Sequence, residues 1–282
     1  MPHRRKDLRT LVETGRTCIA PGASDALSAR LVEEAGFPVA YIGSYATAAS
    51  RFGFADVGLL ALPELVEQAR TVVDAVKIPV IADAEGGFND AANIWRTVRA
   101  YEQAGVAAIH IEDHAFGKHA EVAQRLRPRE EAVGRLKAAL DARTDPNFLI
   151  IARTDAAWAL KDPVEAVLRM EAYAEAGADL VFPTGMTPPQ IAAVRERIGK
   201  PIVAVDTPGF GFDDEEQAGI SIVLYYGLSV CVQYAAVKAA LAALRTARHG
   251  DRVPGWRENV AELEQFLGYN DFVARVMKYG PG

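Results

Sequence analysis

Short apolar runs alternate with longer amphipathic stretches along most of the 282-residue chain. The runs have the length of buried strands, and the stretches repeat their apolar residues at helical spacing. Strands are predicted near residues 18–21, 39–43, 79–84, 107–112, 148–153, 180–184, 201–205 and 221–225. Helices are predicted near residues 24–35, 63–76, 90–104, 128–142, 163–176, 187–198 and 228–247. Eight strands alternating with helices over this length predict an α/β fold of the (β/α)₈ TIM-barrel type.

Glycines mark several of the predicted boundaries. Gly36, Gly105 and Gly177 each follow a helical stretch and precede an apolar run. A glycine there can adopt the left-handed conformation that ends a helix. A doubly wound sheet would also alternate strands and helices, but it more often has a glycine fingerprint after its first strand. Residues 21–25 do not match that fingerprint, so the barrel is preferred.

The chain continues beyond the eighth predicted strand–helix unit. Pro254 and Gly255 break the long helical pattern, and two further helices are predicted at 257–266 and 270–279. We therefore expect a barrel domain over residues 1–250 and a helical extension over 251–282. A barrel does not need such an extension. We expect it to pack on a neighbouring subunit of a homo-oligomer.

Composition and charge narrow the classes of partner. Half of the residues are apolar, and the formal net charge is −6 with both signs interspersed. This balance argues against a nucleic-acid or anionic-membrane partner. Cys18 and Cys231 are too few for a disulfide framework. We expect no signal peptide and no apolar run of about 18 residues. The expected location is the cytoplasm.

Acidic residues follow the predicted strands. Asp83 and Glu85 come at the end of residues 79–84 and are two positions apart, so their side chains share one face. Glu112, Asp113 and Asp206 end other strands. The carboxyl ends of barrel strands form the usual active site, and acids gathered there would repel one another without a cation. Oxygen ligands suit Mg²⁺ or Mn²⁺. A pair of solvated acids is the simpler interpretation of Asp83 and Glu85 taken alone.

Basic residues near these acids also need an explanation. Arg153 ends an apolar run, where its charge needs a partner. That partner is either a bound carboxylate or phosphate, or a nearby acid such as Glu112. His110 shares a face with Glu112 and is expected to be an interior histidine. Lys118, in the loop after the fourth predicted strand, is either a cation that closes over an anionic substrate or an ordinary surface lysine.

With these residues in view, the chain resembles the isocitrate lyase/phosphoenolpyruvate mutase superfamily over nearly its whole length. Residues 83–88 are close to the family's D-x-D-x-G-x-G motif, and residues 111–113 match its I-E-D. Lys118 matches its loop lysine. Residues 151–156 resemble the A-R-T-D-A of the lyase branch more than the A-R-x-E-A of the phosphonate branch. Residues 174–179 form another shared block.

The resemblance implies a Mg²⁺ or Mn²⁺ cofactor and a role for each matching position. Asp83 would be the main metal ligand, and Glu85, Glu112 and Asp56 would hold its water shell. Arg153 and the backbone at Gly43–Ser44 would hold a substrate carboxylate. In the family the metal stabilises an enolate. The candidate residues are Tyr41, Lys118, Arg153 and His119 for catalysis; Gly43, Ser44, Tyr45, Asp56, Arg153 and Thr184 for the substrate; and Asp83, Glu85 and Glu112 for the metal. The resemblance also suggests a tetramer built as a dimer of dimers, in which the C-terminal helices could be swapped between subunits.

Several positions depart from the family pattern. Lyases of the family have K-[KR]-C-G-H in the gate loop, where the cysteine is the general acid, whereas residues 118–122 read Lys-His-Ala-Glu-Val. His119 is one candidate for the missing acid, and a plain loop residue is the other interpretation. Glu85 replaces an aspartate, Thr184 a glutamate and Val205 an asparagine. The far side of the pocket should therefore be less polar, and isocitrate or methylisocitrate cleavage is not expected.

The main hypothesis is a Mg²⁺-dependent enzyme that breaks a carbon–carbon bond in a small 2-oxo or 2-hydroxy carboxylate. Either decarboxylation of an oxaloacetate-like acid or retro-aldol cleavage of a malate-like acid with an apolar substituent would fit. Carbon–phosphorus chemistry on a phosphonate is one alternative, which the missing cysteine favours and the Arg153–Thr154–Asp155 motif opposes. A barrel that binds an acid without converting it is another.

Overall fold

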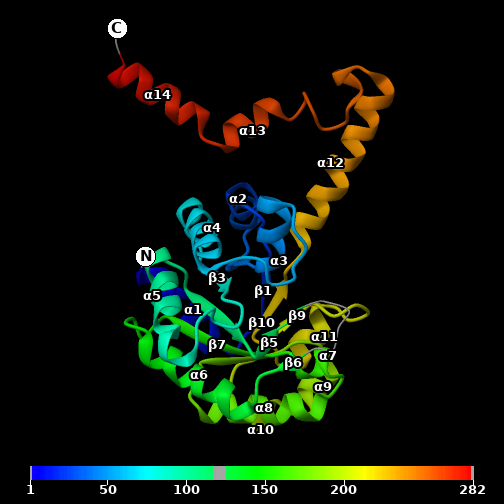
Figure 1. Cartoon of the computed structure of the whole chain (residues 1–282). Helices are drawn as coiled ribbons and strands as arrows, with labels where there is room; N and C mark the ends of the chain where they lie inside the picture. Colours follow the sequence, from blue (N-terminus) through cyan, green and yellow to red (C-terminus); the bar gives the residue numbers. More distant parts are fainter. Residues whose placement is uncertain (1, 117, 119–124, 281–282) are drawn as a thin grey trace. The chain divides into compact units, whose positions relative to one another are not determined.

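The computed structural model describes residues 2–116, 118 and 125–280 of the chain, and its elements alternate as predicted (Figure 1). Each of the eight predicted strands is present, with ends that lie within two residues of the prediction. The barrel strands are β1 (Cys18–Pro21), β2 (Ala40–Ile42), β3 (Val80–Asp83), β4 (Ala108–Glu112), β7 (Leu149–Thr154), β8 (Leu180–Pro183), β9 (Val203–Val205) and β10 (Ile222–Tyr225).

The strands pair in parallel and close into a ring. One run has the order β2-β3-β4-β7-β8, and another has the order β1-β10-β9. Parallel bridges between Gly22 and Tyr41 and between Val181 and Ile202 join the two runs. This closed parallel arrangement confirms the predicted (β/α)₈ barrel.

Helices form the outer layer of the barrel. They are α1 (Pro2–Glu13), α2 (Ala26–Glu34), α4 (Leu62–Ala75), α5 (Ile94–Ala104), α6 (Arg129–Ala142), α8 (Pro163–Glu175), α9 (Pro188–Ala192), α10 (Arg195–Ile198) and α11 (Phe212–Gln217). The single helix predicted at 187–198 is wrong in one respect, because α9 and α10 are separate. Val194 lies between them with φ −122° and ψ −11°, outside helical geometry.

Short elements that the periodicity did not predict follow several strands. They are α3 (Ser44–Thr47), a π-helix η1 (Ala48–Phe52), a 3₁₀-helix η2 (Ala91–Asn93), the antiparallel pair β5 (His114–Phe116) and β6 (Arg125–Leu126), and α7 (Ala156–Ala159). Most of them lie just after the carboxyl ends of β2, β4 and β7. They are too short to show a period, yet they surround the strand ends where barrel active sites form.

Two apolar layers hold the barrel together. Inward residues such as Ile81 and Ile151 form an interior cluster, and outward residues such as Ile150 pack under the helices. This alternation follows the two-residue period of a strand. Helix α1 contributes the fully buried Leu8 to the interior cluster. The same helix carries Arg5, which is buried and lies 3.0 Å from Asp145.

The chain divides into two compact units, residues 1–230 and 231–282. This division falls earlier than the predicted residue 250. The second unit contains most of α12 (Leu228–Ala247), then the 3₁₀-helix η3 (Gly250–Arg252), α13 (Val260–Phe266) and α14 (Tyr269–Tyr279). By length and composition alone, α12 could cross a membrane, although we expected no such segment. None of its residues is buried within the described chain.

One buried acid lies outside the strand-end cluster. Glu215 of α11 is only 1% exposed, and its Oε2 has no hydrogen-bond partner among the described residues. Burial, followed by the nearby charges of Asp206 and Asp214, raises the pKa of Glu215 to about 7. An acid whose pKa is higher in the folded chain than in the unfolded chain destabilises the fold when it ionises.

We predict that Glu215→Gln stabilises the protein at alkaline pH and not at acidic pH. The penalty of the wild-type carboxyl is absent below its unfolded pKa, grows as pH rises towards 7, and is complete above that value. At pH 8.5 the variant should be more stable by about 2 kcal/mol, measured by urea unfolding. The exposed neighbour variant Glu216→Gln is the matched control. An equal change at pH 5 and pH 8.5 would contradict this prediction.

Candidate active site

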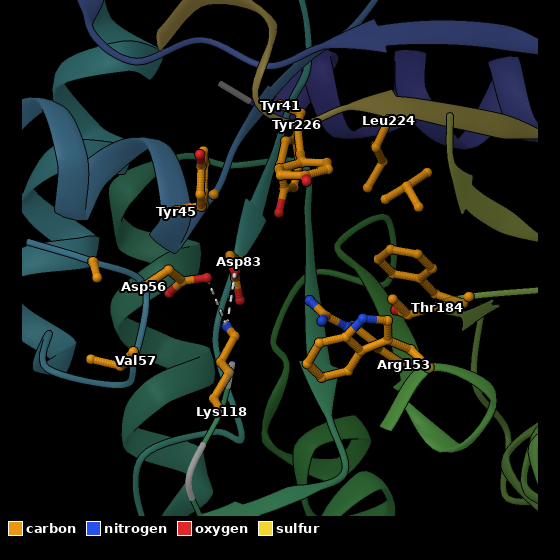
Figure 2. Close-up of a pocket in the computed structure, with 16 residues that line it drawn as sticks. Tyr41, Tyr45, Asp56, Val57, Asp83, Lys118, Arg153, Thr184, Leu224 and Tyr226 are labelled. Atoms are coloured by element: carbon orange, nitrogen blue, oxygen red, sulfur yellow. Dashed lines mark ion pairs between the residues drawn. The ribbon is translucent and has the colours of Figure 1, made fainter. Parts of the chain in front are cut away.

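A pocket of about 450 Å³ opens at the carboxyl ends of the strands (Figure 2). Charged side chains gather on one part of its wall: Asp56, Asp83, Lys118 and Arg153. The rest of the wall is uncharged and largely apolar. The predicted residues Tyr41, Gly43, Tyr45 and Thr184 also line this pocket. Residues predicted at the strand ends therefore lie together around one cavity.

Lys118 lies at the centre of the acidic cluster. Its Nζ is 2.9 Å from Glu85 Oε2 and 3.4 Å from Glu112 Oε2. It is 3.8 Å from Asp56 Oδ2 and 3.9 Å from Asp83 Oδ2. The Lys118 side chain is only 5% exposed, so it is not an ordinary surface lysine. Four carboxylates from three separate segments thus surround one positive charge.

Asp83 is held in one orientation by its neighbours. Ser44 donates from its backbone N and lies with its Oγ 2.9 Å from Asp83 Oδ2. The backbone N of Glu85 donates to Asp83 Oδ1 at 2.8 Å, and the Tyr101 hydroxyl donates to the Asp83 carbonyl. The hydrogen bonds from Ser44 and from the Glu85 backbone N hold both oxygens of the Asp83 carboxylate at the pocket wall.

Glu85 reaches the cluster from a strained turn. Its φ is +49°, in the left-handed region, where a residue with a side chain costs about 1 kcal/mol or more. The turn after β3 also includes Gly87 at φ +85°. The longer glutamate still reaches the shared cation, with its carboxylate 2.9 Å from Lys118 Nζ. Backbone strain of this kind is typical of functional sites.

The cluster has more negative charge than Lys118 alone can balance. Burial favours the neutral form of Asp83, but the nearby charges, of which Lys118 is the strongest, and the hydrogen bond from the Glu85 backbone N together outweigh this effect and keep the pKa of Asp83 well below its usual range. For Glu85 and Glu112, burial dominates and raises the pKa. Glu112 Oε2 is buried without a hydrogen-bond partner among the described residues. A cation of higher charge would satisfy this set of acids better than one ammonium group.

The oxygen atoms of the cluster fit a hard divalent cation. Carboxylates and the Ser44 hydroxyl are the described groups that contact the Lys118 ammonium. Among the described residues, no group of three or more histidine, cysteine, aspartate or glutamate side chains is already arranged as a metal site. Mg²⁺ commonly keeps several waters in proteins. Acids at these spacings therefore suit a cation held partly through water.

Arg153, at the end of β7, sits beside this cluster and is paired with two acids. Its Nε and Nη2 bond Asp155 at 2.7 and 3.0 Å, and its Nη1 is 3.2 Å from Glu112 Oε2. Glu112 and Arg153 are direct partners in the register of β4 and β7. A guanidinium has five N–H groups, so these contacts leave donors for a ligand carboxylate. The ion pair and the ligand-binding interpretations of Arg153 are therefore compatible.

Asp83 is the one predicted strand-end acid among the described lining residues of this pocket, whereas Glu85 and Glu112 contact Lys118 without lining it. Asp113 and Asp206 lie outside the Lys118 cluster. Asp113 accepts from Arg169 Nη1 at 3.1 Å and from the Tyr173 hydroxyl at 2.9 Å, and it also accepts from the backbone N of Asp155 at 3.0 Å. It supports the turn that carries Asp155. Asp206, after β9, does not line the pocket. Adjacent residues on a strand face opposite ways, which separates Asp113 from Glu112.

Tyr41 and His110 form a buried polar pair at the pocket wall. The Tyr41 hydroxyl is 2.9 Å from His110 Nε2, and His110 Nδ1 is 3.6 Å from Asp83 Oδ1. Burial lowers the pKa of His110 to about 4, so the ring is neutral at pH 7. The Asp83 carboxylate favours a proton on Nδ1, so Nε2 accepts from Tyr41. His110 is an interior histidine, as predicted. Gly43 is also fixed here, since a Cβ would lie 2.8 Å from the Tyr41 hydroxyl.

Other residues complete the comparison between prediction and structure. His119 lies outside the described residues. Thr184 follows β8, and Tyr45 belongs to α3. Sequence reasoning missed Trp158, Phe182, Leu224 and Tyr226 as pocket residues. Their only signal was position, at or just after strand ends, because apolar side chains carry no chemical signature of a site.

The chain matches known proteins over most of its length. Residues 8–245 match the family model described as phosphoenolpyruvate phosphomutase. The chain is 37% identical to 2,3-dimethylmalate lyase of Eubacterium barkeri, covering 92% of this chain and 91% of the relative. It is 36% identical to oxaloacetate decarboxylase of Rhodopseudomonas palustris (strain BisB5), covering 86% and 85%. A crystal structure of phosphonopyruvate hydrolase with oxalate and Mg²⁺ has a TM-score of 0.88 at 32% identity, covering 98% and 99%.

We predict that Lys118→Gln destabilises the protein when divalent cations are removed. Without the ammonium group the four buried carboxylates repel one another, and a broken buried ion pair costs several kcal/mol. In EDTA the midpoint of thermal unfolding should fall by about 5 °C or more. Added Mg²⁺ should restore most of this loss, and should raise the midpoint of the variant more than that of the wild type. The exposed Lys137→Gln is the matched control. Equal midpoints of Lys118→Gln and wild type in EDTA would refute the prediction.

Proposed function

The chain belongs to the phosphoenolpyruvate mutase/isocitrate lyase superfamily, and from this premise we propose that it is a divalent-metal-dependent enzyme that breaks a carbon–carbon bond in a small 2-oxo or 2-hydroxy carboxylate. Its relatives include a lyase and a decarboxylase whose names specify dimethylmalate and oxaloacetate. Both names describe small carboxylic acids. The proposal assigns this substrate class to the pocket at the barrel mouth.

One observation carries the proposal: four carboxylates surround a single cationic centre beside a buried arginine. Such a site offers oxygen ligands for a metal and a guanidinium for a carboxylate within one small cavity. A 2-oxo or 2-hydroxy acid has complementary groups, because its adjacent oxygens can chelate a metal while a carboxylate binds Arg153. Apolar walls exclude water, which strengthens both interactions.

Asp83 would hold the metal, with Glu85, Glu112 and Asp56 around it. Mg²⁺ is the proposed ion, with Mn²⁺ as the alternative. When bound, such a cation acts as a Lewis acid that stabilises negative charge developing on the oxygens of an oxo acid. The crystal structure of the related phosphonopyruvate hydrolase contains Mg²⁺ and oxalate. The chain's own residues account for the other requirements of the reaction.

Arg153 and Tyr41 have distinct proposed tasks. Arg153, kept in place by Asp155, binds and orients a substrate carboxylate with its remaining N–H groups. Tyr41 holds a proton at its hydroxyl oxygen, which lines the pocket and is hydrogen bonded to the neutral His110. Burial raises the pKa of Tyr41 well above its usual value, so the hydroxyl stays protonated. Tyr41 remains the proposed catalytic hydroxyl where the gate-loop cysteine is absent, and to donate to a substrate its proton would have to turn from His110 Nε2 towards the pocket.

Carbon–phosphorus chemistry is the second candidate function. Phosphonopyruvate hydrolase, at 32% identity, is the observation in its favour. Asp155 argues against it, because the Arg153–Thr154–Asp155 motif matches the lyase branch and Asp155 binds Arg153 through both oxygens. The same assay can separate the two candidates, since phosphonopyruvate releases phosphate and the other acids do not.

We predict metal-dependent release of pyruvate or another oxo acid from at least one member of a substrate panel. The panel contains oxaloacetate, malate, 2,3-dimethylmalate and phosphonopyruvate, each with Mg²⁺ or with EDTA. EDTA should abolish turnover. Asp83→Asn should lower it by more than about 100-fold, since even residues that only support metal ligands cost 10–100-fold. Asp141→Asn, an exposed change on α6, should leave the rate unchanged.

Three outcomes would decide against the proposal. Turnover that persists in EDTA at the same rate would show that the reaction does not need a divalent metal. Oxalate binding in Mg²⁺, with no conversion of any acid in the panel, would favour a barrel that only binds an acid. Phosphate release from phosphonopyruvate alone would favour the second candidate.

We also propose that the chain forms a homo-oligomer through α12, α13 and α14. These helices carry exposed large apolar residues such as Val237, Leu241, Leu263, Phe272 and Met277. An exposed apolar surface of this size is typical of a protein–protein interface. We propose that a second copy of the chain packs against it. A dimer of dimers remains the expected form, in the cytoplasm and without a nucleic-acid partner.

Sedimentation of the full chain tests the proposed oligomer. We predict the mass of four chains for the wild type and a smaller species for the double variant Phe272→Asp/Val276→Asp, because both residues are exposed and apolar on α14. Lys278→Asp, an exposed change in the same helix, should keep the wild-type mass. A monomeric wild type, or partition of the wild type into lipid vesicles, would contradict the proposal.

A further inference from the structure

The part of the pocket wall away from the acids is apolar. Val205 and Leu224 end β9 and β10 and are direct partners in their register. Phe182 ends β8, Trp158 lies in α7, and Tyr226 follows β10. In Figure 2, Leu224 and Tyr226 lie across the cavity from Lys118 and Asp56. The cavity thus has a charged part and an apolar part.

We propose that the substrate carries, besides its chelating acid group, an apolar branch larger than a methyl group that lies against Val205, Leu224 and Tyr226. This inference rests on the proposed function and adds the substrate class to it. The branch is a branched-alkyl or aryl group. Residues at the ends of β9 and β10 are then the ones that determine specificity.

The charges of the pocket support this assignment. Lys118 is surrounded by acids, and Arg153 is already bound to Asp155 and Glu112. Arg153 lies over the Phe182 ring, 5.4 Å from its centroid, and Lys161 Nζ lies 6.0 Å from the Trp158 ring centroid. The described lining residues Val205, Leu224 and Tyr226 carry no charge. A further carboxylate placed there would be buried without a partner, which is costly. A substrate that places a further carboxylate against Val205, Leu224 and Tyr226, beyond the one bound by Arg153, is therefore disfavoured.

The size of the cavity supports a branch of several atoms. A four-carbon diacid has about nine non-hydrogen atoms, which fill roughly 270 Å³ at the spacing of liquid water, about 30 Å³ each. The cavity measures about 450 Å³. If about three metal-bound waters occupy half of the remaining volume, the other half admits roughly three more non-hydrogen atoms at that spacing. An acid without a branch would leave the apolar wall uncovered.

The aromatic groups of this wall are fixed in place. Tyr45 and Tyr226 pack edge to face, with ring centroids 5.4 Å apart and planes at 82°. Gly185, at φ +88°, keeps Trp158 close, since a Cβ at Gly185 would lie 2.9 Å from the Trp158 backbone N. Preformed aromatic surfaces of this kind bind apolar groups without paying for their own ordering. Each methylene of a ligand buried here should improve affinity by about four-fold.

Calorimetric binding to the full chain in Mg²⁺ tests the inference without relying on turnover. The probes are oxalate, pyruvate, 4-methyl-2-oxopentanoate, phenylpyruvate and 2-oxoglutarate. We expect 4-methyl-2-oxopentanoate to bind at least about ten-fold more tightly than pyruvate, because its additional methylene and methyl groups reach the apolar wall. We expect 2-oxoglutarate, which has a distal carboxylate, to bind more weakly than the branched acid.

Two pocket variants and one control test whether the branch lies against the apolar wall. Tyr226→Arg, at a half-exposed position that tolerates a charge, should reverse the order and favour 2-oxoglutarate, with oxalate affinity unchanged within about two-fold. Val205→Ala, a conservative second variant, should weaken the branched acid by several-fold and leave oxalate unaffected. The exposed Leu31→Arg on α2 is the matched control and should keep the wild-type order.

The outcomes separate this inference from the proposed function. Oxalate binding with no gain for the branched acid, or with 2-oxoglutarate preferred by the wild type, overturns the inference alone. No binding of oxalate in Mg²⁺ overturns the proposed function and this inference with it. A gain for the branched acid that is lost in Tyr226→Arg supports the assignment of the apolar wall.

Discussion

The ammonium of Lys118 is a buried positive charge that stabilises four carboxylates at the carboxyl end of the barrel. Four carboxylates from the loop after η1, the turn after β3 and the end of β4 meet within 4 Å of it. Without a cation these acids would repel one another in a poorly solvated site. Asp83, Glu85 and Glu112 all contact this ammonium group, and Glu112 also contacts Arg153. A divalent cation at the same place would satisfy the same groups more fully.

The proposed chemistry follows from combining this charged cluster with apolar walls. Charges in a site closed to water act more strongly than they do at a surface. Asp155 keeps Arg153 paired and oriented, so the guanidinium is ready for a carboxylate. Val205 and Leu224 line the same pocket as the charged residues and are apolar. The pocket can thus bind an acid at one part and select an apolar group at another.

Much of the fold and the position of the candidate site were predictable from the sequence. Strand length, the helical period and the position of polar residues at strand ends can all be read from short stretches of the chain. They located the eight strands and placed Asp83, Glu112 and Arg153 at neighbouring strand ends, where Glu112 contacts Arg153. The central place of Lys118 was not predictable, since the loop that carries it has no period. The separation of Asp113 from Glu112 depends on which face each residue takes. Apolar residues such as Trp158 cannot be assigned to the pocket from the sequence, because only the folded barrel shows which of them line it.

A crystal structure of the full chain grown with Mn²⁺ and oxalate tests the central claim most directly. We predict anomalous scattering from one Mn²⁺ ion beside Asp83, with Glu85 and Glu112 around it and the Lys118 ammonium displaced from its position between the four carboxylates. Oxalate should lie on the ion, on the side of Arg153. Oxalate bound elsewhere, with Lys118 still among the acids and no manganese signal beside Asp83, would contradict the account.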